Sequence, residues 1–278
     1  MPELPEVETT VRDLNIIVGF SIINIKLNRN NLRYPIPKNK ISLTKNSKIL
    51  SIIRVAKYIV LNLSFKYSII IHLGMSGRLK IFNTKKYENK EKHDHIEIFL
   101  TNGIKLIFND PRRFGIFDIL KTHDIYNSKY FHNLGKDPFD KDFEEKYLFN
   151  KINKSKSSIK SLLINQKIVS GIGNIYACEI LFDSKISPKL RGKDFTINKT
   201  KVLIKSIKKI LKIAINNRGT SLKNYYLING TLGNYQNKFK VYNKEGEYIK
   251  IGRKKAKIIK IIQLGRSTFF CPFVQKNK

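Results

Sequence analysis

Short apolar runs recur at regular spacing along the first part of the chain, after an opening segment that we expect to be helical from Glu6 to about Val18. Many short strands at regular spacing are typical of a β-sandwich or barrel. The runs are Ile22–Leu27, Ile49–Val55, Tyr58–Leu63, Ser68–His72, Arg78–Phe82, Ile96–Leu100 and Lys105–Phe108. Asn102-Gly103, between the last two runs, predicts a tight hairpin turn.

The pattern becomes helical after Gly135-Lys136-Asp137-Pro138, which we interpret as a linker. Asp142 and Glu145 have the spacing of a capping box and predict a helix start. Apolar residues then follow helical spacing in three segments. These are Ile159–Asn165, Ile175–Asp183 and Ile197–Asn217, the first two separated by Ser170-Gly171-Ile172-Gly173-Asn174.

β-like runs return from Lys238 onward, with a hairpin expected between Ile258–Gln263 and Thr268–Phe273. The expected fold class is therefore α+β and multidomain. An N-terminal β-sandwich flanked by helices would span residues 2–134, a helical domain 135–237, and a C-terminal hairpin region 238–278.

Composition limits the class of protein. The chain has 278 residues, of which 41 % are hydrophobic, enough for two domains with cores of their own. Acidic residues stand where a signal peptide would be basic, and no apolar stretch has the length of a membrane span. Cys178 and Cys271 are the two cysteines, so no disulfide framework is implied. We expect a cytoplasmic protein without a membrane partner.

The charge balance points to a polyanionic partner. Lys and Arg number 54 against 21 Asp and Glu, a formal net charge of +33. Such an excess favours nucleic acid first and an anionic membrane surface second. A compositional drift toward Lys, Asn and Ile would also raise the basic count.

The N-terminus carries candidate chemistry in Pro2 and Glu3. If Met1 is removed, Pro2 presents a secondary amine, and a free α-amino group has a reference pKa of about 8. Such an amine can attack an electrophilic carbon and form an iminium, which is covalent catalysis by an amine. The other interpretation is that Pro2-Glu3 merely opens a helix.

Four internal segments are candidates for the same site, although each has an ordinary interpretation. Lys57 fits a solvated lysine at a strand end, Met75 a core or turn residue, and Arg112-Arg113-Phe114 a surface turn. Gly171-Ile172-Gly173-Asn174 is a weak phosphate-loop signal at a helix start.

Taken together and in order, these blocks resemble the formamidopyrimidine-DNA glycosylase family of bacteria. The matching blocks are Pro2–Thr9, Ala56-Lys57-Tyr58, His72–Gly77, Lys92–His95, Asp110–Gly115, Gly171–Glu179 and Gly265–Pro272, which cover essentially the whole chain. The resemblance implies a helix–two-turn–helix domain after the sandwich and a C-terminal hairpin that is a degenerate zinc finger.

The resemblance implies a bifunctional enzyme of base excision repair: a glycosylase for oxidised purines in damaged double-stranded DNA, and an abasic-site lyase. Pro2 would attack C1′ and form a Schiff base, and Glu3 would be the general acid that opens the sugar ring. Lys57 and Arg266 would act in β- and δ-elimination and contact phosphates. We expect a monomer in a bacterial cytoplasm, associated with the nucleoid through DNA.

The resemblance also implies the DNA contacts. Met75, Arg112 and Phe114 would fill the void that a flipped nucleotide leaves. His72 and His93 would lie near the DNA backbone, and Asn174 would hold a phosphate. Arg218–Lys223 resembles the start of the loop that closes over the flipped base.

The chain departs from the family pattern at two places. Of the four expected zinc ligands only Cys271 is present; the other positions fall near Ile249, Gly252 and Val274, so we expect no zinc and no other cofactor. We expect Cys178 to lie away from the hairpin, and packing of Ile258, Ile259, Ile261, Ile262, Phe269, Phe270 and Phe273 to hold it instead.

The second departure is at Ser155, where the family has a DNA-contacting lysine. Lys154 or Lys156 compensates, or one phosphate contact is lost. Two alternatives to the leading function remain at this point. One is the related endonuclease VIII branch, which acts on oxidised pyrimidines, and the other is a decayed DNA-binding protein without catalysis.

Overall fold

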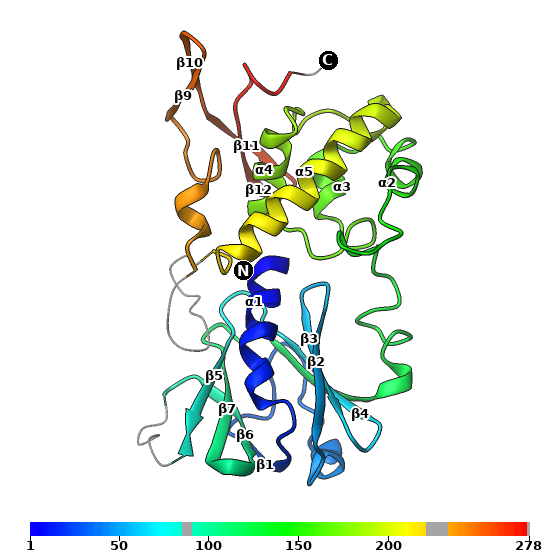
Figure 1. The fold of residues 1–278 in the computed structure, drawn as a ribbon, viewed down its shortest axis with the longest axis vertical. Coiled ribbons are helices and arrows are strands. Elements are labelled where there is room, and N and C mark those ends of the chain that lie inside the picture. Colours follow the sequence, from blue (N-terminus) through cyan, green and yellow to red (C-terminus); the bar gives the residue numbers. More distant parts are fainter. Residues whose placement is uncertain (85–90, 221–232, 277–278) are drawn as a thin grey trace. The chain divides into compact units, whose positions relative to one another are not determined.

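The computed structural model describes residues 1–84, 91–220 and 233–276 of the chain (Figure 1). It divides into two compact units. The first consists of Met1–His132 with Asn217–Gln236, and the second of Asn133–Asn216 with Asn237–Lys278. The segment 217–236 thus belongs to the unit of the N-terminal sandwich, and the C-terminal hairpins belong to the unit of the helices.

The first unit is built on two four-stranded antiparallel sheets. One has the order β1 (Ile22–Leu27), β6 (Asp94–Leu100), β7 (Ile104–Asn109), β5 (Arg78–Asn83). The other has the order β2 (Ile49–Val55), β3 (Tyr58–Leu63), β4 (Tyr67–His72), β8 (Ile116–Lys121). The seven predicted runs are confirmed as strands, and β8 was not predicted.

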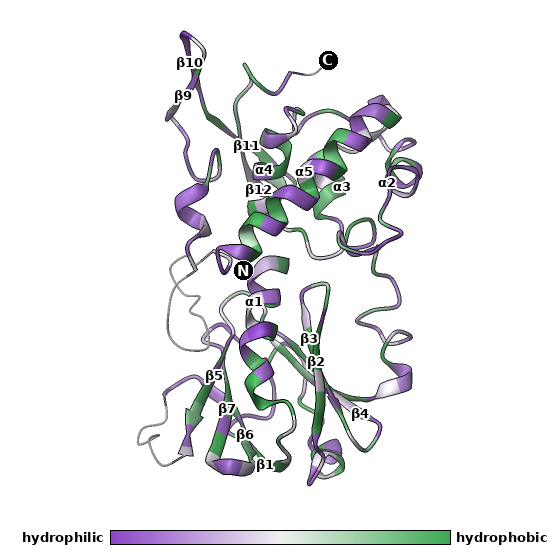
Figure 2. Cartoon of the chain, viewed as in Figure 1, coloured by the Kyte–Doolittle hydropathy of each residue, from purple (hydrophilic) through white to green (hydrophobic). Residues whose placement is uncertain are grey.

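The core of this unit lies between the two sheets and beneath α1 (Leu4–Leu14). Aliphatic residues of both sheets pack into one cluster together with Val7, Val11 and Leu14 of the helix. Figure 2 shows the apolar colour concentrated along these strands. Burying one such side chain stabilises the fold by about 1.5–3 kcal/mol, so the sandwich is a rigid support for the turns at its edges.

Two local predictions in this unit are refined by the structure. The first helix begins at Leu4 rather than Glu6 and ends at Leu14, where the 3-10 turn η1 (Asn15–Ile17) follows. Asn102 and Gly103 do form the hairpin turn between β6 and β7, within η4 (Thr101–Gly103). Both have positive φ, 62° and 67°, as a tight hairpin turn requires.

The second unit contains the helices α2 (Glu145–Ile152), α3 (Ile159–Ile164), α4 (Asn174–Asp183) and α5 (Ile197–Asn216). Two hairpins follow, β9 (Tyr248–Ile251) with β10 (Lys254–Lys257), and β11 (Ile259–Gln263) with β12 (Arg266–Phe270). The 3-10 segment η6 (Gly192–Asp194) also lies in this unit, whereas η2 (Lys38–Thr44) and η5 (Thr122–Asp124) lie in the first unit and η7 (Tyr235–Lys238) spans the boundary. The fold is the predicted mixture of a sandwich, a helical region and terminal hairpins.

Two expectations for this unit were wrong. The helix predicted to start at Asp142 begins at Glu145, because Asp142–Glu144 form a turn around the fully buried Phe143. The segment interpreted as a linker, Gly135–Pro138, lies just after the boundary between the units, and it is bonded within the second: Gly135 N–H donates to the Gln166 carbonyl, and Lys136 bridges to Val169.

The second error concerns the packing of the last hairpin. Cys178 of α4 lies in one buried cluster with Val241, Ile258 and Phe269, and is therefore not away from the hairpin. Ile262 and Phe273, which were expected to pack, are 64 % and 47 % exposed. A few residues on one face of the hairpin hold it against α4, and the tip stays in solvent.

Candidate active site and nucleic-acid interface

Pro2 and Glu3 are buried at the start of α1. Glu3 is the N-cap residue, and its N–H donates to Glu6 Oε2 at 2.8 Å. The two glutamates form a reciprocal capping box, which satisfies N–H groups that a helix start leaves without partners. Pro2-Glu3 therefore does open a helix, and the same contacts hold Glu3 in one position.

Glu6 also contacts Gly219 and Thr220, which lie at the start of the predicted closing loop. Its second oxygen, Oε1, accepts the Thr220 N–H at 2.7 Å. Gly219 has φ +70° and lies so close to Glu6 that an added Cβ would be 2.9 Å from Oε1. Arg218 donates to both carboxylate oxygens of Asp13 at 2.8 Å. The start of the predicted closing loop is thus anchored on α1, while Ser221, Leu222 and Lys223 lie outside the described residues.

Lys57 lies in the two-residue turn between β2 and β3, where Ala56 has a positive φ of 55°. The interpretation of Lys57 as a solvated lysine is wrong, because the residue is only 6 % exposed. Arg54 supports the turn by donating to the Ala56 carbonyl and to Glu8 of α1. An ammonium group held in so little solvent has restricted freedom and a strong local field.

His72 ends β4 beside this turn and is neutral. Its ring packs against Tyr58 at 4.7 Å between centroids, and its Nδ1 accepts the Gly74 N–H at 3.0 Å. Burial, and to a smaller extent the positive charges of Lys57 and Arg33, lower the pKa of His72 to about 4. A neutral imidazole with an accepting Nδ1 fixes the turn that begins at Gly74.

Met75, Arg112 and Phe114 lie on two turns that pack directly against each other. An added Cβ on Gly74, whose φ is +64°, would be 2.5 Å from the Phe114 carbonyl carbon. Met75 and Phe114 are 42 % and 44 % exposed, and the Arg112 guanidinium lies 5.2 Å from the Phe114 ring centroid. The structure therefore brings these three predicted residues together, with two apolar side chains in solvent.

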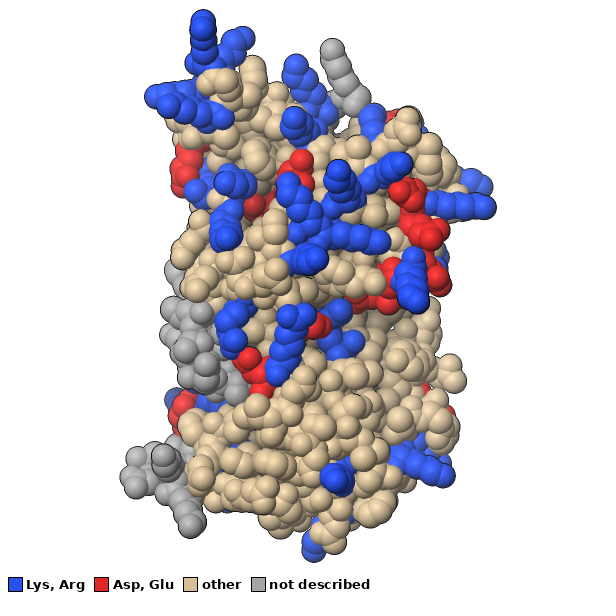
Figure 3. Space-filling view, in the orientation of Figure 1, with Lys and Arg blue, Asp and Glu red and all other residues tan. Residues whose placement is uncertain are grey.

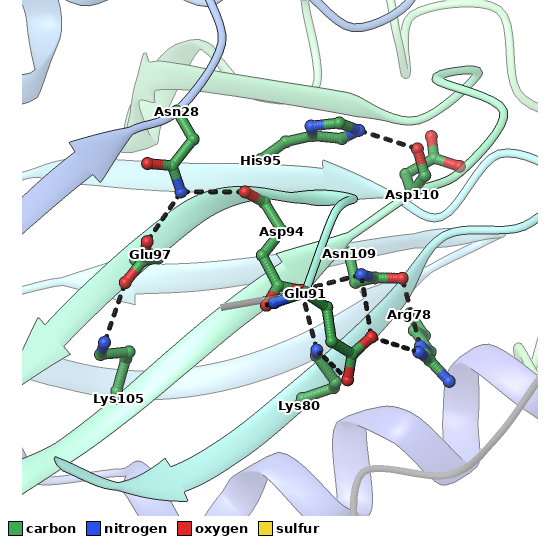
Figure 4. Close-up of polar contacts among 10 residues, drawn as sticks. All are labelled: Asn28, Arg78, Lys80, Glu91, Asp94, His95, Glu97, Lys105, Asn109 and Asp110. Carbon is green, nitrogen blue, oxygen red and sulfur yellow. Dashed lines mark hydrogen bonds and ion pairs between the residues drawn. The ribbon is translucent and has the colours of Figure 1, made fainter. Parts of the chain in front are cut away.

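His93 is half-buried in the segment that leads into β6. A network of ion pairs and hydrogen bonds, in which Lys80 and Asp94 are buried, holds this segment, as Figure 4 shows. Lys80 Nζ pairs with Asp94 at 2.8 Å and with Glu91 at 2.9 Å, and Asn109 donates to Asp94 at 2.8 Å. Sequence reasoning missed this network, because its members come from three strands that are distant along the chain.

In the second unit, Asn174 and Arg266 are connected through one residue of the last hairpin. Asn174 starts α4, and its Nδ2 donates to the Ser267 carbonyl at 2.9 Å. Arg266, next to Ser267, starts β12 and is exposed. The hairpin tip that carries Arg266 is thus attached to the helix start that carries Asn174.

Lys160 supports the same hairpin and was missed by sequence reasoning. It is 1 % exposed, and its Nζ donates to Thr268 Oγ1 at 2.6 Å and to the Ser267 carbonyl at 3.2 Å. In the sequence, the role of Lys160 is indicated only by its place next to apolar Ile159 in a short helix. The partner lies more than a hundred residues further along the chain.

Ser155 follows α2 and is half-buried, with exposed Lys154 and Lys156 on either side. Its carbonyl accepts the Lys193 N–H at 2.8 Å, and its hydroxyl accepts the Ser157 N–H at 3.2 Å. The two lysines therefore present their charges to solvent around a serine whose hydroxyl is used within the loop.

At the positions where zinc ligands were expected, Cys271 alone has a side chain that could bind the metal. Ile249 packs against the apolar cluster of the hairpin, Gly252 lies in the β9–β10 turn, and Val274 has no donor side chain. Cys271 is fully buried, and its N–H donates to Gln275 Oε1 at 2.9 Å. One thiolate cannot supply the four ligands of a structural zinc site.

Basic side chains gather on the second unit in the view of Figure 3, and few lie on the visible face of the sandwich. Along α5 the exposed lysines recur on one face, at Lys201, Lys205, Lys208 and Lys212. None of the helices in the described part of the chain is long and apolar enough to cross a membrane.

The family model described as the formamidopyrimidine-DNA glycosylase N-terminal domain matches residues 1–117, and that described as the H2TH domain of the same enzyme matches residues 134–225. The formamidopyrimidine-DNA glycosylase of Zymomonas mobilis is 43 % identical, over 99 % of this chain and all of that protein.

Solved structures agree over the whole length. A complex of Lactococcus lactis Fpg with DNA containing an abasic site has a TM-score of 0.89 at 34 % identity, and covers 99 % of each chain. A complex of MutM with DNA containing carbocyclic 8-oxo-G has a TM-score of 0.88 at 35 % identity, over 99 % of this chain and all of that chain.

Proposed function

Because the chain belongs to the formamidopyrimidine-DNA glycosylase family, we propose that it removes oxidised purines, 8-oxoguanine and formamidopyrimidines, from duplex DNA and then cuts the strand at the abasic site. The observation that carries this proposal is the buried Pro2-Glu3 pair, held by Glu6 at the start of α1. The DNA-bound relatives support a nucleic-acid substrate.

The first step requires a free amine at residue 2. Met1 is 45 % exposed, so it is accessible to an aminopeptidase, and its removal leaves the Pro2 nitrogen as a secondary amine. This amine attacks C1′ of the damaged nucleotide, and the bond from C1′ to the base breaks. Glu3 donates a proton to the ring oxygen as the sugar opens, which leaves an iminium between Pro2 and C1′.

The iminium then drives strand cleavage. Its positive charge acidifies the C2′ protons, so loss of one proton expels the 3′ phosphate by β-elimination. A second elimination expels the 5′ phosphate, and water releases the sugar fragment from Pro2. In this proposal Lys57, which is buried in the first unit, is a proton donor in the eliminations and a phosphate contact. Arg266, which is exposed in the second unit, acts in δ-elimination and contacts a phosphate.

The target nucleotide must leave the base stack to reach Pro2, which costs a few kcal/mol. Met75 and Phe114 are flexible or flat apolar side chains held in solvent, the kind of group that enters a stack of bases. Arg112 can donate to the base left without a partner. His72 and His93 lie beside these turns. Asn174 would contact the DNA backbone, as would the lysines on either side of Ser155.

Defined duplexes test the substrate class. Strand cleavage at 8-oxoguanine should exceed cleavage at thymine glycol, since Met75 and the His72–Gly77 block match the purine branch of the family. Glu3→Gln should lower cleavage at 8-oxoguanine by roughly 10²–10⁴-fold, the range for loss of a general acid. Asp124→Asn is the control, because Asp124 is an exposed carboxylate of the same unit that pairs with His123 instead.

A preference for thymine glycol would move the protein to the endonuclease VIII branch. Binding of both duplexes without cleavage of either would make it a DNA-binding protein without catalysis.

A further inference from the structure

Asp110 is a fully buried carboxylate to which the proposed mechanism gives no role. It follows β7 directly, between Asn109 of the charged network and the turn that carries Arg112 and Phe114. A carboxylate removed from water is costly unless donors replace the lost hydration. The donors that Asp110 receives come from both turns that carry the exposed side chains Met75 and Phe114.

The two carboxylate oxygens connect the two turns. Oδ1 accepts the Ser76 hydroxyl at 2.7 Å, and Oδ2 accepts the Gly115 N–H at 2.8 Å. The Ser76 hydroxyl oxygen in turn accepts the Arg112 N–H at 3.0 Å. Ser76 is the neighbour of Met75, and Gly115 is the neighbour of Phe114. Arg112 is therefore bonded through its backbone to Ser76, and Met75 and Phe114 are sequence neighbours of the two residues that donate to the carboxylate. All three predicted void-filling residues are connected to Asp110 in this way.

The backbone of Asp110 adds a third connection. Its N–H donates to the His93 carbonyl at 3.1 Å, and its carbonyl accepts from His95 Nε2 at 2.9 Å. Figure 4 shows the His95 contact at the edge of the network that contains Asn109, Asp94 and Lys80. The carbonyl also accepts the Arg113 N–H at 3.2 Å, which closes the turn. Asp110 is thus fixed to β6 before it reaches either turn.

Close packing leaves the two turns little freedom to separate. A Cβ on Gly115 would be 2.5 Å from the Phe108 ring and 3.0 Å from Asp110 Oδ2. A Cβ on Gly74 would meet the Phe114 backbone, as described above. Charge-assisted hydrogen bonds are about twice as strong as neutral ones, so the carboxylate is the strongest connection in this contact.

We propose that Asp110, acting with Ser76, is a positioning residue that holds Met75, Arg112 and Phe114 as one rigid wedge. The proposal rests on the proposed function, since it assigns a purpose to the wedge in nucleotide extrusion. A rigid wedge enters the stack without a loss of loop entropy at that moment. Asp110 touches neither substrate nor the reacting atoms and acts through the residues it holds.

The test compares Asp110→Asn and Ser76→Ala with Asp118→Asn. Asp118 is the matched control because it also accepts one hydroxyl and one backbone N–H, from Tyr130 at 2.7 Å and Ile119 at 2.8 Å, away from the wedge turns. Two readouts are used. Single-turnover base release from an 8-oxoguanine·cytosine duplex requires extrusion, and borohydride trapping on a single-stranded abasic oligonucleotide requires the amine but no void filling.

Asp110→Asn and Ser76→Ala should slow base release by about tenfold or more, and leave trapping on the single strand unchanged. The fluorescence rise of 2-aminopurine placed beside the lesion should slow in parallel, as a reporter of unstacking. Combined with Met75→Ala, Asp110→Asn should add much less than its own factor, since residues that act as one unit are not additive.

The outcomes separate the two proposals. If the wild-type chain traps no abasic DNA and releases no 8-oxoguanine, the proposed function fails. If the wild type is active and Asp110→Asn behaves as Asp118→Asn does, or is additive with Met75→Ala, the positioning role is wrong. Ser76→Ala keeps the Gly115 bond to the carboxylate, so it decides the matter if Asp110→Asn does not fold.

Discussion

At the scale of single residues, buried polar groups define the candidate site, and each has a specific partner. Glu3 is held through Glu6, Asp110 through Ser76 and Gly115, and His72 through Gly74. None of these contacts stabilises the fold much by itself, because a buried hydrogen bond contributes about 1 kcal/mol net. Their effect is to hold each of these side chains in a single conformation.

His72 gives a pH dependence at this scale. Its pKa in the folded chain is about 4, whereas an unfolded histidine titrates near 6.5. Between these values the unfolded chain binds a proton that the folded chain does not, so stability falls as pH falls from 6.5 toward 4. Burial also lowers the pKa of His95, which contributes in the same direction.

Urea unfolding at pH 7 and pH 4.5 checks this expectation, with His72→Gln as the comparison. The variant should lose less stability on acidification than the wild type, by up to about 1.4 kcal/mol for each unit of pKa difference removed. An NMR titration that finds His72 protonated at pH 6 would show that the ring is more solvated than described.

At the scale of elements, strands and helices were predictable and the contacts between them were not. Short apolar runs at regular spacing predicted the strands β1–β7, because each strand contributes apolar residues to the core. The strand β8 was missed, since the short apolar run Ile116–Lys121 does not distinguish a strand from a buried helix segment without its partner β4.

The same limit applies to the site. Pro2, Glu3 and Lys57 carry chemistry that a sequence can indicate, but no local signal connects Glu6 with Thr220 or Lys160 with Thr268. These pairs are joined only by folding. Asp110 stood within a recognised block, yet its role depends on a serine that lies 34 residues earlier.

The last hairpin provides the prediction for this scale. Its attachment consists of the buried Ile258 and Phe269 against Cys178, with Lys160 bonded to Thr268. We expect a purified chain to contain no stoichiometric zinc, and a chelator to leave its melting temperature unchanged. Phe269→Ala should instead destabilise the unit by about 3–5 kcal/mol, with Phe273→Ala, an exposed ring on the same hairpin, as the control.

One tightly bound zinc per chain in a metal analysis would contradict this account of the hairpin. So would a fall in melting temperature on addition of the chelator that added zinc reverses.

At the scale of the whole molecule, the two units divide the predicted residues between them. The first carries the proposed nucleophile Pro2, the proposed general acid Glu3 and the proposed wedge, and the second carries Asn174, Arg266 and most of the basic side chains visible in Figure 3. The net charge of +33 supplies attraction to any nucleic acid, so binding alone does not test the assignment. The covalent step does.

Borohydride trapping on a duplex with a single abasic site shows directly which amine attacks the DNA. We expect one covalent protein–DNA adduct, which peptide mapping places on the Pro2 nitrogen of chains that have lost Met1. A form that retains Met1 has an amide at Pro2 and should give no adduct. An adduct on Lys57, or equal trapping by the Met1-retaining form, would contradict the claim that Pro2 is the nucleophile.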